Sequence, residues 1–416
     1  MRILMTHKEK QKDAVVRAAI GGQLTSTRAG KMLDISSRQV RKLKAKVRAG
    51  ESLRHGNSKR SPKRLADDMR ERIVQIYKTF EFRDSNFSQF RELLETHHDI
   101  KVSYTFLKNV LNEAGIKSPK KQRKRKIHKS RPPKEHFGEM LQTDGSHHQW
   151  FKPFGDNAFY TAHAFMDDAT GTVTGAQFSK NECLDGYCEA FRQTLEDYGV
   201  PGSVYADGLS IFFGKEHQPS IAEMLDGIYE RKTQFGAILD ALGVELIHAR
   251  SSQAKGKIER LWQTFQSRLV IEFKINKIDN VEKANNFMPK FLADFNKKFT
   301  KPATNDRSDF LPLPKHINLD TLLVKKFSRK LDAGLVFSLH NNKYRVDGVP
   351  PKATVEVLMS SRLGFKALYQ DKLHDPVPLV NPERTEDMLH FYLFKNERVQ
   401  YGNLDVRKKE IVQIAL

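Results

Sequence analysis

The stretch MLQTDGSHHQW, residues 140–150, is the one around which the rest of the chain is organised. A short apolar approach leads to Asp144, a glycine follows, and the pattern predicts a strand. A carboxylate in the middle of a buried strand is costly unless it is paired or binds a metal ion. We therefore interpret Asp144 as a metal ligand. Two later acids, Asp207 and Glu259, occur in settings that fit the same site.

The sequence from Gly138 to about residue 275 predicts alternating strands and helices. The predicted strands are 140–150, 158–168, 171–180, 203–208 and 244–249, and the predicted helices are 181–199, 228–242 and one from about 256. This order is typical of the ribonuclease-H-like fold and of few others: three antiparallel strands, then helix, strand, helix, strand and helix. We therefore expect an α/β catalytic core of this class over residues 138–275.

This strand order places the first and fourth strands side by side, so Asp144 and Asp207 would emerge at one place. Glu259, in the first turn of the helix packed over that edge, can reach the same point. Three converging carboxylates repel and take up protons unless cations neutralise them. Two Mg²⁺ ions about 4 Å apart resolve the repulsion and suit in-line phosphoryl transfer. Hard oxygen ligands favour Mg²⁺ or Mn²⁺ over zinc.

Some nearby residues have simpler interpretations. Asp167 and Asp168 are rival acids at the predicted hairpin, and a turn role is the prediction for both. Trp262, three residues after Glu259, is predicted to pack in the core.

The length and the net charge of the chain indicate a nucleic-acid partner. The chain has 416 residues, which predicts two to four domains, and a formal net charge of +21. An acidic membrane surface is the alternative partner, but no apolar run is long enough for a spanning helix. The N-terminus lacks the apolar core of a signal peptide. Cys183 and Cys188 support neither a disulfide framework nor a zinc site, so we expect a reducing cytoplasm.

Residues 1–50 are predicted to form a helix-turn-helix domain. Two short helices are broken at residues 34–36, with Ser36 or Ser37 as the N-cap of the second. The other face of that second helix is basic, and we expect it to lie in the major groove of DNA. The predicted DNA contacts are Arg38, Gln39, Arg41, Lys42 and Lys44. A small helical bundle with a solvated face is the alternative.

The rest of the chain divides into predicted linkers and small domains. Residues 117–137 are predicted to be a basic tether along the DNA backbone, with Arg123, Lys124 and Arg125 among its contacts; a solvated tether is the alternative. The other expected segments are a basic linker at 51–64, a second helical, helix-turn-helix-like domain at 65–116, a helical and irregular connector at 276–325, a small all-β barrel at 326–395 and a charged tail at 396–416.

Three short blocks carry a family resemblance. QTDG (142–145), YADGLSIF (205–212) and SSQAKGKIERLWQTFQ (251–266) resemble the catalytic blocks of DDE transposases in the retroviral-integrase superfamily. Within it, the chain resembles bacterial insertion-sequence transposases of the ISNCY type. The resemblance implies that Asp144, Asp207 and Glu259 are a metal-binding triad for Mg²⁺, with Mn²⁺ as a substitute.

The resemblance also implies contacts and partners. Lys255, Lys257 and Arg260 would face the DNA end. The expected partners are double-stranded DNA, as terminal inverted repeats and as target, and further copies of the chain in a homodimer or larger synaptic complex. The expected location is the bacterial cytoplasm, in association with the nucleoid.

Two features depart from the family pattern. The interval between Asp207 and Glu259 is longer than in the compact integrase core, with the surplus at 211–228, and the zinc-binding N-terminal domain of integrases is absent. The expected activity is 3′-end cleavage and strand transfer. Two alternatives stay open, a metal-dependent nuclease without strand joining and a catalytically silent DNA-binding repressor.

Overall fold

The structure, a computed structural model, describes residues 7–53, 67–119, 131–214, 232–249, 255–339 and 342–379. The chain divides into two compact units, Met1–Arg72 and Ile73–Leu416. No helix in the described ranges combines the length and the apolar character needed to cross a membrane. The predicted DNA contacts Arg123, Lys124 and Arg125 lie outside the described residues.

Before the start of α4, the first unit contains the helices α1 (His7–Ile20), α2 (Ser26–Leu33) and α3 (Ser37–Arg48). They enclose a small core of Val15, Ala19, Ala29 and Val40. The chain turns sharply after α2 because Asp34 adopts a left-handed conformation, with φ of 52°. Ser36 then caps α3 in a reciprocal capping box with Gln39. The predicted break at residues 34–36 and the predicted cap are confirmed.

Replacing Ser36 with alanine is expected to weaken the start of α3 by about 1 kcal/mol, because an alanine cannot accept the hydrogen bond from the Gln39 backbone N–H. Hydrogen exchange of the Gln39 amide in the whole chain should then accelerate about fivefold. Ser26→Ala is the matched control, since Thr25 and not Ser26 caps α2. Equal exchange in the two variants would show that the cap contributes nothing.

The second unit begins with a helical part. The helix α4 (Asp67–Lys78) crosses the boundary between the units, and its part from Ile73 belongs to the second. It is followed by α5 (Phe87–His98), capped by Asn86, and α6 (Tyr104–Glu113), capped by Ser103. Within this unit α5 contacts the long helix α10 (Gly256–Asn276). The Glu92 carboxylate accepts a hydrogen bond from the Arg268 guanidinium at 2.7 Å, and the Gln89 side chain donates one to the Arg268 backbone carbonyl at 2.9 Å.

A five-stranded sheet forms the centre of this unit, in the order β4-β3-β2-β5-β6. Its strands are β2 (Leu141–His148), β3 (Tyr160–Asp167), β4 (Val173–Ser179), β5 (Ser203–Ala206) and β6 (Glu245–His248). The first three are antiparallel, and β5 and β6 run parallel to β2. This is the strand order predicted for a ribonuclease-H-like core. Of the predicted helix 228–242 the structure describes α9 (Gln234–Ala241), and most of the surplus at 211–228 lies outside the described residues.

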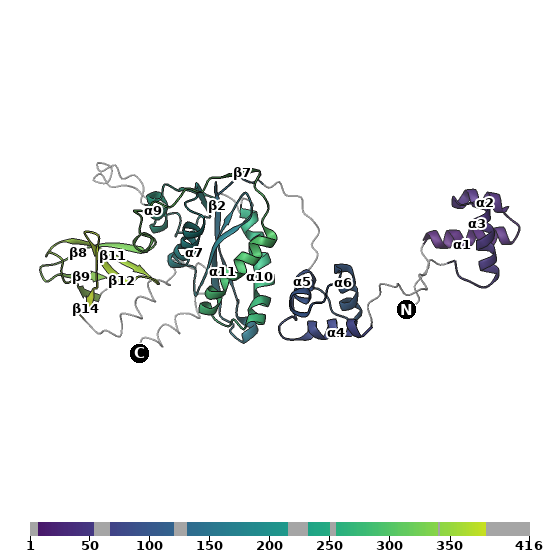
Figure 1. The fold of residues 1–416 in the computed structure, drawn as a ribbon, viewed down its shortest axis with the longest axis horizontal. Coiled ribbons are helices and arrows are strands. Elements are labelled where there is room, and N and C mark those ends of the chain that lie inside the picture. Colours follow the sequence, from purple (N-terminus) through teal and green to yellow (C-terminus); the bar gives the residue numbers. More distant parts are fainter. Residues whose placement is uncertain are drawn as a thin grey trace. The chain divides into compact units, whose positions relative to one another are not determined.

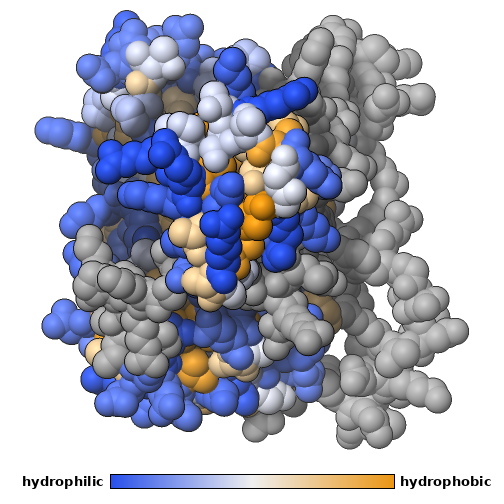
Figure 2. Space-filling view, turned by 90° about the vertical axis from the view of Figure 1, so that its right-hand side faces the viewer, coloured by the Kyte–Doolittle hydropathy of each residue, from blue (hydrophilic) through white to orange (hydrophobic). Residues whose placement is uncertain are grey.

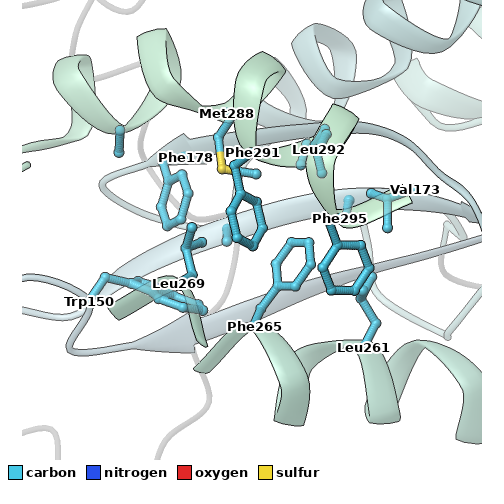
Figure 3. Packing of buried hydrophobic residues seen from close by; sticks show 14 of the residues in the cluster. Trp150, Val173, Phe178, Leu261, Phe265, Leu269, Met288, Phe291, Leu292 and Phe295 are labelled. Carbon is cyan, nitrogen blue, oxygen red and sulfur yellow. The ribbon is translucent and has the colours of Figure 1, made fainter. Parts of the chain in front are cut away.

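Helices cover both faces of the sheet (Figure 1). α7 (Leu184–Asp197) packs on one face, where Leu141 and Phe165 point. α10 and α11 (Val281–Phe299) pack on the other face, around Ala164 and Met166. Along β3, therefore, side chains alternate between the two cores. Figure 3 shows aromatic and aliphatic side chains of α10 and α11 meeting Phe178 of β4 and Trp150, which follows β2.

α11 occupies a place that the sequence did not predict. Residues 276–325 were expected to be a helical and irregular connector, and in the structure Phe291 and Phe295 of the helix α11 pack edge-on against Phe265 of α10, with ring centroids 5.3 and 5.0 Å away. The apolar side chains of α11 thus complete the core on this face. The connecting segments also include β1 (His136–Phe137) paired with β7 (Asn305–Ser308), a short 3₁₀ helix η1 (Lys152–Phe154) and α12 (Leu319–Leu322).

The C-terminal part consists of two small antiparallel sheets. One contains β8 (Lys325–Lys330), β11 (Thr354–Ser360), β12 (Gly364–Tyr369) and β13 (Lys372–His374), and the other contains β9 (Val336–Leu339), β10 (Asn342–Arg345) and β14 (Val377–Pro378). Phe337, Tyr344, Val355 and Val357 lie in their common core. A closed barrel stays a prediction, and the expected tail at 396–416 lies outside the described residues.

Candidate active site

Asp144 lies on the face of β2 that α10 covers. Its neighbours on this face also contact α10: Gln142 accepts from the Ile258 backbone N–H at 3.3 Å, and Ser146 accepts from Gln266 at 3.1 Å. Burial raises the pKa of the Asp144 carboxyl, although the adjacent Lys255 ammonium opposes that effect. A carboxylate so placed needs a cationic partner.

Asp207 follows β5 directly, and β5 is the strand beside β2. Leu141 pairs with Val204 and Gln142 with Tyr205, and the same parallel register sets Asp144, inside β2, beside Asp207. Asp207 Oδ1 accepts from the Leu209 backbone N–H at 3.2 Å, which turns the chain away from the sheet. The predicted adjacency of the first and fourth strands is confirmed.

Lys255 joins the two acids. Its ammonium lies 2.7 Å from Asp144 Oδ1 and 3.1 Å from Asp207 Oδ2, and its side chain is 7% exposed. Burial by itself would lower the pKa of Lys255, but the two carboxylates outweigh it and raise the pKa above its ordinary value. The paired acids attract the Lys255 ammonium into the site, and a contact between Lys255 and the DNA end stays a prediction.

Glu259 is exposed in the first turn of α10. It does not join Asp144 and Asp207 in a group whose ligand atoms lie within 4.8 Å of one another. Among the described residues, the group of that kind is His136, Glu139 and Asp309. The structure thus brings two of the three predicted acids to one cation and leaves the third on the helix beside them.

The group around Glu139 already has protein partners. Lys134 donates to Glu139 at 2.7 Å, and His136 Nδ1 lies 3.1 Å from Asp309. The hydrogen bond from Lys134 lowers the pKa of Glu139. These contacts join β1 to the segment after β7 and give the three side chains protein partners.

The rival acids are occupied elsewhere. Asp167 is buried and accepts from the Gly138 and Thr170 backbone N–H groups, as the predicted turn role requires. Asp168 is also buried and accepts from Arg131 at 2.7 Å, and Lys257 lies 3.1 Å from it. The buried Asp168 carboxylate thus holds the Lys257 ammonium, and a contact between Lys257 and DNA stays a prediction.

The remaining predicted DNA contacts lie on exposed helix surface. Arg260 is exposed on α10, with its Nε donating to the Gly256 carbonyl at 2.7 Å. Of the predicted contacts on α3, Arg38, Gln39, Arg41 and Lys42 are exposed and Lys44 is half-buried. Gln39 has a structural role that was not predicted, since its side chain accepts from the Ser36 backbone N–H.

One acid near the site was not predicted. Glu182 lies beside Gly145, where an added Cβ would be 2.6 Å from Glu182 Oε1, and the Tyr187 hydroxyl donates to the same oxygen at 2.5 Å. Burial raises the pKa of Glu182 against the effect of that hydrogen bond, and the charge of Asp144 raises it further. An acid between the end of a strand and the start of a helix was the available signal.

Comparisons with known proteins agree with the geometry. The chain is 33% identical over 371 residues to the transposase for insertion sequence IS1202 of Streptococcus pneumoniae, covering 81% of this chain and 77% of that protein. It is 32% identical over 351 residues to the putative transposase y4bF of Sinorhizobium fredii, covering 83% and 74%. No protein-family model matches the chain.

Solved structures include two viral neighbours. One is the simian T-cell lymphotropic virus intasome in complex with PP2A regulatory subunit B56 gamma, at 14% identity and a TM-score of 0.30, covering 74% of this chain and 96% of that chain. The other is the HTLV-2 integrase catalytic core domain in complex with magnesium, in its trimeric form, at 17% identity and a TM-score of 0.28, covering 39% and 88%.

Proposed function

The chain belongs to the family of insertion-sequence transposases, and we propose that it binds the terminal inverted repeats of its element, cleaves the 3′ ends and joins them to target DNA. One observation carries the proposal, namely that Asp144 and Asp207 on adjacent strands share one buried cation, the Lys255 ammonium. Two carboxylates that lie close enough to share one cation can also supply oxygen ligands to a divalent metal ion. The proposed reaction is therefore phosphoryl transfer that depends on Mg²⁺.

Asp144, Asp207 and Glu259 would hold the metal. The donor set fits Mg²⁺ and Mn²⁺, because all of its ligand atoms are carboxylate oxygens. Held by these residues, Mg²⁺ would supply the Lewis-acid chemistry of phosphoryl transfer, which is charge stabilisation at the attacking and leaving oxygens. Glu259 is exposed in the first turn of α10, so its side chain can approach the site without disturbing the core.

The protein itself provides the framework for this reaction. The sheet fixes the spacing of Asp144 and Asp207, and α10 contacts the sheet at Gln142 and Ser146. Lys255 neutralises the pair of acids until a divalent ion takes over that neutralisation. Its ammonium would then be free to meet a phosphate of the DNA end.

Replacing Lys255 with methionine is expected to lower the free energy of unfolding without divalent metal by about 2 kcal/mol, because Asp144 keeps its burial and loses its counter-charge. Asp207 is half-exposed, so hydration of its carboxylate offsets part of the lost interaction with Lys255. Added Mg²⁺ should stabilise the variant more than the wild type. Urea unfolding followed by tryptophan fluorescence measures this core, since both tryptophans, Trp150 and Trp262, are buried in it.

The control for that comparison is Lys232→Met, which removes an exposed ion pair with Asp240. Such a pair contributes little, so the control should change stability by less than about 0.5 kcal/mol. Equal stability of wild type and Lys255→Met without metal would contradict the counter-charge role of Lys255.

Binding to DNA is proposed to use the first unit. The exposed cations of α3 suit the major groove, and the net charge of +21 suits a polyanion. Figure 2 shows a face on which hydrophilic side chains predominate among the described residues and hydrophobic ones form only small groups. Two ends must be held together for transposition, so we propose a homodimer or larger synaptic complex.

Strand transfer with a labelled terminal-repeat duplex and Mg²⁺ tests the proposed function. Joined products are the expected result. Nicked ends without joining would instead assign a nuclease, and binding without cutting would assign a repressor. Omitting the metal, or adding a chelator, should abolish the joined products and leave the DNA complex intact.

A further inference from the structure

Trp262 makes a contact with Asp144 that its position in the core does not require. It lies on α10, three residues after Glu259, and is 5% exposed. Its ring packs against Phe265 with centroids 5.7 Å apart, as the core prediction requires. Its indole N–H, however, donates to Asp144 Oδ2 at 3.1 Å. The ring serves the core and the N–H reaches the site.

The other tryptophan shows how an indole is satisfied when its role is structural. Trp150 is fully buried in the same core and donates its N–H to the Ser146 backbone carbonyl at 3.3 Å. A buried indole N–H needs an acceptor, and a backbone carbonyl is sufficient. Trp262 donates instead to a carboxylate, and a hydrogen bond to a charged acceptor is stronger and more directional.

The two oxygens of Asp144 therefore have different partners. Oδ2 is bonded to Trp262, and Oδ1 lies 2.7 Å from the Lys255 ammonium, which also contacts Asp207. With Oδ2 held, the carboxylate cannot rotate without losing the indole bond. Oδ1 is thus the oxygen directed at the shared cation.

We propose that Trp262 is a positioning residue for Asp144, holding Oδ2 through its indole N–H and so assigning Oδ1 to the cation that Asp144 shares with Asp207. This role rests on the proposed function, because the cation in question is the divalent ion of that reaction. Groups that orient a metal ligand change metal affinity by roughly tenfold to a hundredfold when they are removed. Trp262 should therefore affect metal binding as well as packing.

The matched pair Trp262→Phe and Trp150→Phe separates these effects. Each variant removes one indole N–H from the same core, but Trp262→Phe alone removes a bond to Asp144. We expect Trp262→Phe to weaken Mn²⁺ binding by the full chain about tenfold or more, measured by electron paramagnetic resonance of free Mn²⁺, and Trp150→Phe to change it less than about threefold. Equal Mn²⁺ affinities of the two variants would overturn the positioning role.

Two further measurements protect the test against misfolding. In Trp150→Phe the remaining tryptophan is Trp262 itself. Binding of paramagnetic Mn²⁺ beside it should quench its fluorescence saturably. Absence of saturable quenching would overturn the positioning role of Trp262. A benzothienyl side chain at position 262 replaces the N–H by sulfur and keeps the shape of the ring. It should weaken Mn²⁺ binding as Trp262→Phe does, and wild-type affinity would overturn the role.

Asp144→Asn distinguishes failure of this role from failure of the proposed function. If Asp144→Asn loses Mn²⁺ affinity while Trp262→Phe keeps it, the metal site stands and the positioning role falls. If neither variant loses affinity, the metal site falls and the positioning role falls with it.

Discussion

Asp144→Asn is expected to lower the rate of strand transfer at least about a thousandfold, which corresponds to about 4 kcal/mol of transition-state stabilisation. Asparagine has nearly the shape of aspartate, and its amide oxygen can accept the Trp262 N–H that now bonds to Oδ2. The negative charge is what the substitution removes. The fold should therefore persist while the metal site fails.

The measurement is single-turnover strand transfer with saturating Mg²⁺, together with DNA binding by the same preparation. Asp197→Asn makes the same chemical change on the exposed last turn of α7 and should keep the wild-type rate. Loss of joining with retained DNA binding is the expected pattern. A rate within about tenfold of wild type would show that Asp144 is no metal ligand.

Acidification is expected to destabilise the catalytic core through His163. This side chain is fully buried, and burial lowers the pKa of His163 from 6.5 to about 4. In the unfolded chain His163 binds a proton near pH 6.5, whereas in the folded core it stays neutral down to about pH 4. The free energy of unfolding therefore falls as the pH is lowered from 6.5 towards 4. The shift corresponds to about 3 kcal/mol for this group alone.

His163 matters because it holds the turn that carries Glu182. Its Nε2 accepts from the Cys183 backbone N–H at 3.3 Å and its Nδ1 lies 3.2 Å from the Gln177 carbonyl, so Nδ1 carries the proton of the neutral ring. A second proton on Nε2 would break the bond to Cys183. Protonation therefore opposes the folded arrangement of this turn.

Urea unfolding followed by tryptophan fluorescence at about pH 7 and about pH 4.5 measures the effect. His163→Gln should shrink the difference in free energy of unfolding between these conditions by about 2–3 kcal/mol, because glutamine does not titrate. His316→Gln, an exposed control, should leave the difference unchanged. An unchanged pH profile in His163→Gln would contradict the proton linkage.

Much of the core could be predicted from the sequence because local patterns determine it. Asp144 within one predicted strand and Asp207 at the end of another were found from their apolar surroundings and the glycine after each, and the order of elements then required their strands to be neighbours. The same reasoning found the capped turn before α3. Glu259 as the third ligand, and the DNA contacts on α3, stay predictions.

Other features depend on tertiary partners that no local pattern contains. Lys255 and Lys257 look like surface cations in sequence, yet buried carboxylates hold both. A tryptophan in an apolar helix gives no sign of where its N–H will point, so the bond from Trp262 to Asp144 was not foreseen. α11 was assigned to a connector because its apolar side has meaning only against the sheet it covers.

The most direct test compares Asp144→Asn, Asp207→Asn and Glu259→Gln with the wild type in Mg²⁺-dependent strand transfer on one labelled terminal-repeat duplex. Glu259→Gln is the decisive variant, since Glu259 is the acid that the structure leaves apart from the shared cation. We expect each variant to bind the duplex and none to join it to target DNA. Wild-type joining by any one of them would remove that residue from the metal site.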